Sequence, residues 1–309
     1  MHRALVSGIT GHLGHEVAHQ LSQQGITVYG LTRQFVANDD ALGASATLLH
    51  IDGSTSTVLK AFEQANPDIV IHLAGLSRRE HRSCDIEPFV EANILLGTQL
   101  LEGMRISECR RFITAGTYLQ HYDTDAARAF NLYAATRLAF EAVLEFYVDT
   151  YEMSAVRLTL ADIYSEHDTR PKLMTDIAKS WHDSVPLNLR DPDAFVDLIH
   201  LEDAATAFLQ AASLLDNGRI PDRTLSRYSV SSGEDITAQE LVHRFERHAG
   251  RNLHITGDSA PPPSRRIKPR RGEPVPGWKP RITLEDGIRR IVASRPARLA
   301  IERQASITR

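Results

Sequence analysis

Cysteine is scarce in this sequence of 309 residues, which contains only Cys84 and Cys109. Two distant cysteines without metal-type spacing argue against a disulfide framework and against a zinc site, and they fit a reducing compartment. No charged-then-apolar signal region precedes the first strand-like run, and no apolar run approaches the length of a membrane span. We therefore expect a cytoplasmic protein that binds no metal and no membrane.

An excess of charge of either sign is also lacking. The chain carries 35 basic and 39 acidic residues, which gives a formal net charge of -4 at pH 7. This balance offers no general electrostatic basis for binding a nucleic acid. Hydrophobic residues make up 42% and charged residues 24%, which is ordinary for a globular enzyme with a sizeable core.

Short apolar runs alternate with helical patterns over the first half of the chain. Leu13, Val17 and Leu21 recur every four residues and predict a helix that ends at Gly25. Such alternation implies an α/β fold with a Rossmann-type, doubly wound parallel sheet that is covered on both faces. The expected strands are residues 4–6, 27–31, 47–51, 68–73, 112–114 and 155–158, and further helices are expected around Leu59, at 87–105 and at 131–151.

The pattern changes after about residue 161, where prolines, arginines and shorter elements appear. We assign residues 1–160 to a Rossmann domain, to which 194–216 return, and residues 161–309 to a smaller substrate-binding region. The ligand of an open parallel sheet lies beyond the carboxyl ends of its strands, so this region is expected to cap that crevice. It is predicted to contain helices near 171–183, 202–216 and 237–249, another from 284, and strands at 195–200 and 228–231.

A glycine-rich segment joins the first expected strand to the first expected helix. Gly8 permits a tight turn, Gly11 lets the backbone approach a pyrophosphate, and Gly14 allows the helix to pack closely on the strand. The diphosphate of a dinucleotide would then meet the positive end of the helix and its unpaired amide groups. The residues predicted to contact the cofactor here are Gly8, Thr10, Gly11, His12, Leu13 and Gly14.

The spacing Gly-x-x-Gly-x-x-Gly resembles the extended short-chain dehydrogenase/reductase family, which is also called the NAD-dependent epimerase/dehydratase family. The resemblance covers nearly the whole chain and includes the Pro-Gly-Trp-Lys-Pro segment at 276–280. It implies that Asp52 lies near the adenine and that Asn93 is the asparagine of the family's Asn-x-x-Gly-Thr motif. The cofactor contacts implied by this likeness are Asp52, Gly53, Asn93 and the Leu73, Ala74 and Gly75 that follow the fourth strand.

The form of the cofactor is predicted from the end of the second strand. Binding of NAD usually needs an acidic residue there for the ribose 2′-hydroxyl, but the chain has Thr32 and Arg33, and no acid until Asp39. An arginine can pair with the 2′-phosphate of NADP, so we predict NADP(H) in preference to NAD(H). The alternative is that Arg33 is a solvated loop residue.

Tyr133 and Arg137 stand where the resembled family carries Tyr-x-x-x-Lys, at the start of a long helix. Four-residue spacing places both side chains on one helix face, where they are predicted to be catalytic and to contact the cofactor. Tyrosine, with a reference pKa of about 10, is a poor acid at neutral pH, and a nearby cation lowers that pKa. Because arginine is effectively never deprotonated, Arg137 can support Tyr133 electrostatically but cannot relay its proton.

The family also uses a hydroxyl after its fifth strand, and the likeness assigns this catalytic role to Thr117. Segments 116–122, 132–136 and 168–173 resemble the CDP-abequose and CDP-paratose synthase branch, whose members reduce a 4-keto group on a nucleotide-linked deoxysugar with NADPH. Tyr118 stands where sugar dehydratases carry Asp-Glu, which argues against 4,6-dehydration. The residues predicted to bind a nucleotide-sugar substrate are Tyr118, His121, Arg170, Lys172 and Arg270.

Three functions stay open. The favoured one is an oxidoreductase that reduces a nucleotide-bound 4-keto sugar with NADPH. The second is a nucleotide-sugar epimerase with tightly bound NAD, and the third is a dinucleotide-binding protein that has lost catalysis through Arg137. Members of the resembled family often dimerise through the helices expected at 87–105 and 131–151, which implies a homodimer.

Overall fold

The computed structural model describes residues 1–33, 45–121, 128–257 and 272–294. Asp39 and Arg270 lie outside the described residues. The described residues form two compact units, of which the first contains 1–33, 45–121, 128–161, 201–231 and 272–279. The second contains 162–200, 232–257 and 280–294, so residues 194–200 fold with the second unit and Leu201–Ser231 with the first.

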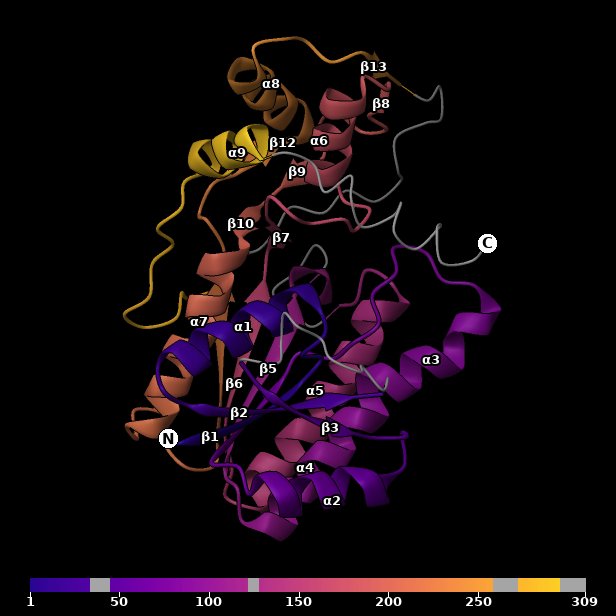
Figure 1. Ribbon diagram of the computed structural model, residues 1–309. Coiled ribbons are helices and arrows are strands. Elements are labelled where there is room, and N and C mark those ends of the chain that lie inside the picture. Colours follow the sequence, from indigo (N-terminus) through magenta and orange to yellow (C-terminus); the bar gives the residue numbers. More distant parts are fainter. Residues whose placement is uncertain (34–44, 122–127, 258–271, 295–309) are drawn as a thin grey trace, which may run out of the picture. The chain divides into compact units, whose positions relative to one another are not determined.

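A sheet of seven described strands forms the centre of the first unit, in the order β11-β6-β5-β4-β1-β2-β3 (Figure 1). Every neighbouring pair is parallel, which confirms the predicted Rossmann-type fold class. The strand order reverses at β1, which lies between β2 and β4, and a crevice for a ligand opens at such a point. The strands are β1 (Arg3–Ser7), β2 (Thr27–Thr32), β3 (Thr47–His50), β4 (Ile69–His72), β5 (Arg111–Thr117), β6 (Ser154–Leu160) and β11 (Thr224–Val230).

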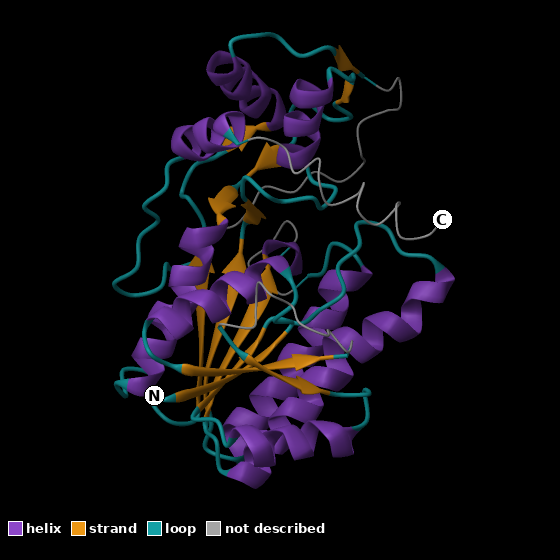
Figure 2. Cartoon of the chain, viewed as in Figure 1, coloured by secondary structure: helices purple, strands orange, loops and turns teal. Residues whose placement is uncertain are grey.

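Helices cover both faces of this sheet (Figure 2). α1 and α7 pack together on one face, and α2, α4 and α5 lie on the other, where Phe62, Phe112 and Phe140 belong to one apolar core. The helices of the first unit are α1 (His12–Gln23), α2 (Thr55–Ala65), α3 (Ile86–Val90), α4 (Leu96–Ser107), α5 (Leu132–Thr150) and α7 (Leu201–Asp216), with short 3-10 turns at η1 (Ser83–Asp85) and η3 (Tyr118–Gln120).

The helix expected at 87–105 contains a π-helical turn, η2 (Glu91–Leu95), between α3 and α4. Three residues separate Asn93 from Gly97, one more than in the Asn-x-x-Gly-Thr motif. A π turn accommodates one extra residue within a helix, so α4 keeps its packing on α5. Gly97 lies at that contact, because a Cβ there would be 2.3 Å from Cε2 of Phe140.

The second unit has its own apolar core, to which Met174, Phe245 and Ile288 contribute. The strand expected at 195–200 is two strands, since β9 pairs with β12 and β10 pairs with β7. None of the helices in the described parts of the chain combines the length and the apolar character needed to cross a membrane. The elements of this unit are β7 (Asp162–Tyr164), α6 (Leu173–Asp183), β8 (Leu187–Asn188), β9 (Phe195–Val196), β10 (Leu198–His200), β12 (Ile236–Thr237), α8 (Ala238–Ala249), β13 (Ile255–Thr256) and α9 (Leu284–Ala293).

Candidate active site

The glycine loop between β1 and α1 has close backbone packing that a side chain would prevent. Gly8 has a φ of 73°, and a Cβ on it would lie 2.6 Å from the backbone nitrogen of Ala74. A Cβ on Gly14 would lie 2.1 Å from the carbonyl oxygen of Gly8, so the helix lies directly against the turn. Gly11 is the N-cap of α1, and its amide donates to that same carbonyl at 3.0 Å. Gly8 and Gly14 therefore play the structural parts that their spacing predicts, the tight turn and the close packing of the helix.

The amino end of α1 fits the diphosphate of a dinucleotide. Among the described residues, no side chain caps this end and no acidic residue lies in its first turn. Thr10 and Gly11 are exposed, and His12 and Leu13 are half-buried. The backbone amides and the positive end of the helix dipole can therefore meet an anion from solvent.

The next two strands present one cation and one anion at the same edge of the sheet. Thr32 is buried at the end of β2, and the side chain of Arg33 is exposed directly after it. Asp52, after β3, accepts hydrogen bonds from the amide of Ser54 and the hydroxyl of Thr57, each at 2.8 Å. Hydrogen bonding to the Ser54 side chain, and then these two bonds, lower the pKa of the Asp52 carboxyl to about 2, so this side chain is anionic at neutral pH.

Asn93 holds the loop that follows β4. Its Oδ1 accepts from the amide of Leu76 at 2.8 Å, and its Nδ2 donates to the carbonyl of Leu76 at 3.0 Å. The same Nδ2 donates to Oγ1 of Thr136 on α5 at 2.9 Å. Asn93 thus ties the loop that contains Leu73, Ala74 and Gly75 to the helix that carries Tyr133.

Tyr133 lies in the first turn of α5 and is half-buried. The side chain of Asn131 caps this helix by accepting from the amide of Ala134 at 3.0 Å. Asn131 also donates to the carbonyls of Arg78 at 3.4 Å and Arg79 at 3.3 Å. The start of α5, and with it Tyr133, is therefore fixed to the chain beyond β4.

Arg137 lies one turn after Tyr133 and points into the protein, with 5% of its surface exposed. Its guanidinium donates to three neutral oxygens: the carbonyl of Ala74 at 3.4 Å, Oγ1 of Thr114 at 3.3 Å, and the carbonyl of Ala115. Burial lowers the pKa of Arg137, while the nearby Tyr133 acts in the opposite direction. By the same interaction, the cation favours the ionised form of Tyr133.

Thr117 ends β5, and its side chain is almost completely buried. Its Oγ1 accepts from the amide of Leu119 at 3.3 Å, and its own amide donates to Oε1 of Gln120 at 2.9 Å. Tyr118 begins the short turn that follows, and His121 comes directly after it. The structure therefore places the predicted Thr117, Tyr118 and His121 together at the carboxyl end of β5.

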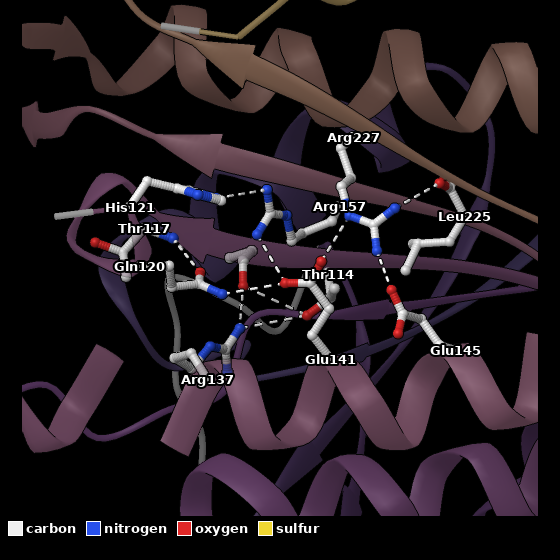
Figure 3. Close-up of polar contacts among 11 residues, drawn as sticks. Thr114, Thr117, Gln120, His121, Arg137, Glu141, Glu145, Arg157, Leu225 and Arg227 are labelled. Carbon is white, nitrogen blue, oxygen red and sulfur yellow. Dashed lines mark hydrogen bonds and ion pairs between the residues drawn. The ribbon is translucent and has the colours of Figure 1, made fainter. Parts of the chain in front are cut away.

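A buried network of charged side chains lies beside these residues (Figure 3). Glu141 on α5 binds Arg157 of β6 and Arg227 of β11, each at 2.7 Å, and Arg227 also pairs with Glu145. Arg157 and Glu141 are 5% and 9% exposed. This network was not predicted from the sequence, although an arginine between Val156 and Leu158 in an apolar strand is a signal that the strand carries a buried charge.

Two of the predicted substrate contacts lie in the second unit. One side of the Arg170 guanidinium is used locally, since Nε and Nη2 donate to Asp168 at 2.7 and 2.6 Å. Lys172 donates to the carbonyl of Ile163 at 3.2 Å and lies 3.6 Å from a carboxylate oxygen of Asp162. Arg270, the third cation predicted for the substrate, lies outside the described residues.

A glycine loop of this geometry at the switch point of a parallel sheet defines a dinucleotide-binding enzyme of the Rossmann type. Residues 4–225 match the sequence model of the NAD dependent epimerase/dehydratase family, and the chain belongs to that family. The resemblance seen in the sequence is thereby confirmed, and a nicotinamide dinucleotide is the cofactor that this family and the glycine loop support.

Similar proteins include both nucleotide-sugar epimerases and a CDP-abequose synthase by name. The chain is 23% identical to the UDP-glucose 4-epimerase of Mycolicibacterium smegmatis, over 94% of this chain and 97% of that protein. It is 20% identical to the CDP-abequose synthase of Salmonella typhimurium, over 93% of this chain and 96% of that protein. Among solved structures, the UDP-glucose 4-epimerase of Thermus thermophilus in complex with NAD matches with a TM-score of 0.76 and 23% identity, over 94% of this chain and 97% of that chain.

Proposed function

We propose that this protein reduces a 4-keto group on a nucleotide-linked deoxysugar with NADPH. The observation that carries the proposal is the position of Tyr133 in the first turn of α5, one turn before the buried guanidinium of Arg137. Thr117 lies at the end of β5, where its hydroxyl can hold the keto oxygen. When bound, the cofactor supplies the hydride, and Tyr133 gives its proton to the oxygen that becomes the alcohol. Arg137 stabilises the tyrosinate that is left.

The preference for NADPH rests on Arg33 and on the missing acid at the end of β2. The exposed guanidinium after β2 is available to a 2′-phosphate, which accepts paired hydrogen bonds from an arginine fork. The acid nearest to it in sequence beyond β2 is Asp39, which lies outside the described residues. The remaining contacts proposed for the cofactor are the glycine loop, Asp52 with Gly53, the loop after β4, and Asn93.

The substrate is proposed to be a nucleotide sugar. Tyr118 and His121 would contact the sugar beside Thr117, and Arg170, Lys172 and Arg270 would neutralise the diphosphate. Because Arg170 is already paired with Asp168, a phosphate would have to compete with that carboxylate. The likeness to a CDP-abequose synthase supports this substrate class.

A cytoplasmic homodimer is the proposed working form. Exposed apolar side chains occur on the helices that the family likeness assigns to a dimer contact. They are Ile86 and Val90 on α3, Leu95 on η2, Ile106 on α4 and Phe146 on α5. Burial of these side chains against a second copy would remove apolar surface from water.

The test is oxidation of NADPH by the purified protein with a panel of 4-keto-deoxysugars linked to CDP, dTDP, UDP and GDP. We expect turnover with at least one of them. The rate should be about 100-fold or more lower for Tyr133→Phe, which keeps the ring but removes the hydroxyl group that donates the proton. The absence of NADPH oxidation across the panel would overturn the proposal. A binding protein without catalysis is indicated if neither the wild type nor Tyr133→Phe shows turnover while both still bind the cofactor.

A second candidate is an epimerase with tightly bound NAD, and the likeness to UDP-glucose 4-epimerases favours it. In that reaction the same Tyr133 would remove and return the proton while the cofactor is recycled. A cofactor that stays bound through purification, together with interconversion of UDP-sugars without added nucleotide, would support this candidate against the reductase.

A further inference from the structure

One carboxylate oxygen of Glu141 joins two parts of the candidate site. Oε2 accepts from Nη1 of Arg157 at 2.7 Å and from Nε2 of Gln120 at 3.2 Å. The other oxygen, Oε1, accepts from Nε of Arg227 at 2.7 Å. Glu141 is therefore held from three sides, and Figure 3 shows it between α5 and the strands that carry the two arginines.

The first branch leads from Glu141 to Thr117. Gln120 donates to Glu141 with its Nε2, which leaves its Oε1 to accept from the amide of Thr117 at 2.9 Å. Gln120 is 1% exposed, so water does not replace either bond easily. The orientation of the Gln120 amide, and so the backbone position of Thr117, depends on the carboxylate of Glu141.

The second branch leads from Glu141 to His121. Arg157 uses Nη1 for Glu141 and Nη2 for Nε2 of His121, at 3.3 Å. A guanidinium only donates hydrogen bonds, so Nε2 of His121 must accept, and the neutral imidazole then carries its proton on Nδ1. Arg157 thereby sets both the ring position and the tautomer of His121.

Gly116 has no side chain, and the space this leaves is occupied by the side chains of Gln120 and Arg157. A Cβ at this position would lie 3.0 Å from Oε1 of Gln120 and 3.2 Å from Cδ of Arg157. Both contacts are tighter than ordinary van der Waals distances between such atoms. The two side chains thus reach Glu141 past a strand position that has no side chain of its own.

We infer that Glu141 is a positioning residue, which through Gln120 and Arg157 holds Thr117 and His121 in one fixed arrangement. The inference rests on the proposed function for its catalytic meaning, because Thr117 and His121 are the residues proposed to meet the substrate. Glu141 is bonded to Gln120, Arg157 and Arg227, so it acts on the rate through the two groups that Gln120 and Arg157 position.

Three variants separate positioning from general stability. Glu141→Gln removes the charge that holds both branches, and Gln120→Met removes the branch to Thr117 while the Glu141–Arg157 pair stays. Glu145→Gln is the matched control, since Glu145 lies one turn further along α5 and pairs with the same Arg227 but is not bonded to Gln120 or Arg157. Because Glu141→Gln also leaves Arg157 without its anion and can reduce the yield of folded protein, Gln120→Met keeps the test decisive.

The first measurement is hydrogen exchange of the Thr117 amide by NMR, which needs no substrate. We expect its protection to fall about tenfold or more in Gln120→Met and Glu141→Gln, and to stay at the wild-type level in Glu145→Gln. The ¹⁵N shifts of His121 should show the Nδ1–H tautomer in the wild type and in Gln120→Met, and a mixture in Glu141→Gln. Unchanged Thr117 exchange in both Gln120→Met and Glu141→Gln would overturn the inference.

The second measurement compares the effect of each variant on kcat with its effect on the dissociation constant for NADPH. We expect Gln120→Met and Glu141→Gln to lower kcat about tenfold or more, with an unchanged dissociation constant for NADPH, because a misplaced hydroxyl slows the chemical step. An equal loss in Glu145→Gln would show a general effect of charge removal and would also overturn the inference. If the wild type turns over no 4-keto sugar, the proposed function fails, and the exchange and tautomer data decide the inference by themselves.

Discussion

Arg33 is the residue on which the choice of cofactor depends. Its exposed side chain follows the last residue of β2, where an acid would instead bind the ribose 2′-hydroxyl of NAD. A charge-assisted hydrogen bond to a phosphate contributes roughly 1.5–3 kcal/mol, so we expect Arg33→Asp to weaken NADPH binding about 10- to 100-fold. Dissociation constants for NADPH and NADH, measured by fluorescence titration, check this expectation.

The matched control for Arg33 is Arg219→Asp. Arg219 is another exposed arginine of the first unit, and it precedes β11, at the end of the sheet opposite to the glycine loop. The same change of charge there should leave both dissociation constants unaltered. Tighter binding of NADH than of NADPH by the wild type would contradict the assignment.

Some residues of the candidate site could be identified from the sequence alone, and others could not. Gly8, Gly14 and Tyr133 were identifiable because each belongs to a short motif whose spacing has a local physical reason. Glu141, Arg157 and Gln120 were not, because they come from a helix, a strand and a turn that meet only when β5, β6 and α5 pack together. The inward direction of Arg137 was equally hidden, since helical spacing gives a face but not its partners.

At the scale of elements, Arg137 links α5 to the loop after β4 and to the middle of β5. One guanidinium reaches the carbonyl of Ala74 after β4 and both Thr114 and the carbonyl of Ala115 in β5. A lysine has one nitrogen and cannot span these oxygens as a planar fork does. We expect Arg137→Lys to lower the free energy of unfolding by about 1–3 kcal/mol, because buried carbonyls lose their donor. Urea denaturation of the wild type and the variant measures this change in the free energy of unfolding.

Arg105→Lys on α4 is the control for this substitution. Arg105 pairs with Glu102 at 2.7 Å, and the two side chains are 39% and 31% exposed. Loss of the fork in such a pair should change stability by less than about 1 kcal/mol. Equal denaturation midpoints for Arg137→Lys and Arg105→Lys would show that Arg137 does not anchor α5 to β5 and to the loop after β4.

The succession of strands and helices along the first half of the chain was predictable. The central strands are short and apolar, and each is bounded by a clear helical pattern. β11 was predicted only over residues 228–231, since it is an edge strand whose first residues are half-exposed and polar. The split of 195–200 into β9 and β10 and the π turn at Asn93 depend on partners far away in the sequence. Periodicity within a segment carries no information about either.

At the scale of the whole molecule, the apolar surface of α3 predicts a second copy as its partner. Ile86 and Val90 are 49% and 45% exposed and lie four residues apart, on one face of the helix. We expect the wild type to sediment as a dimer and the double variant Ile86→Glu, Val90→Glu as a monomer, because carboxylates cannot be buried in an apolar contact without a large desolvation cost. Val185→Glu, at an apolar position of the second unit that is 41% exposed, should leave the dimer intact. A monomeric wild type, or a double variant that still dimerises, would refute the assignment of this surface.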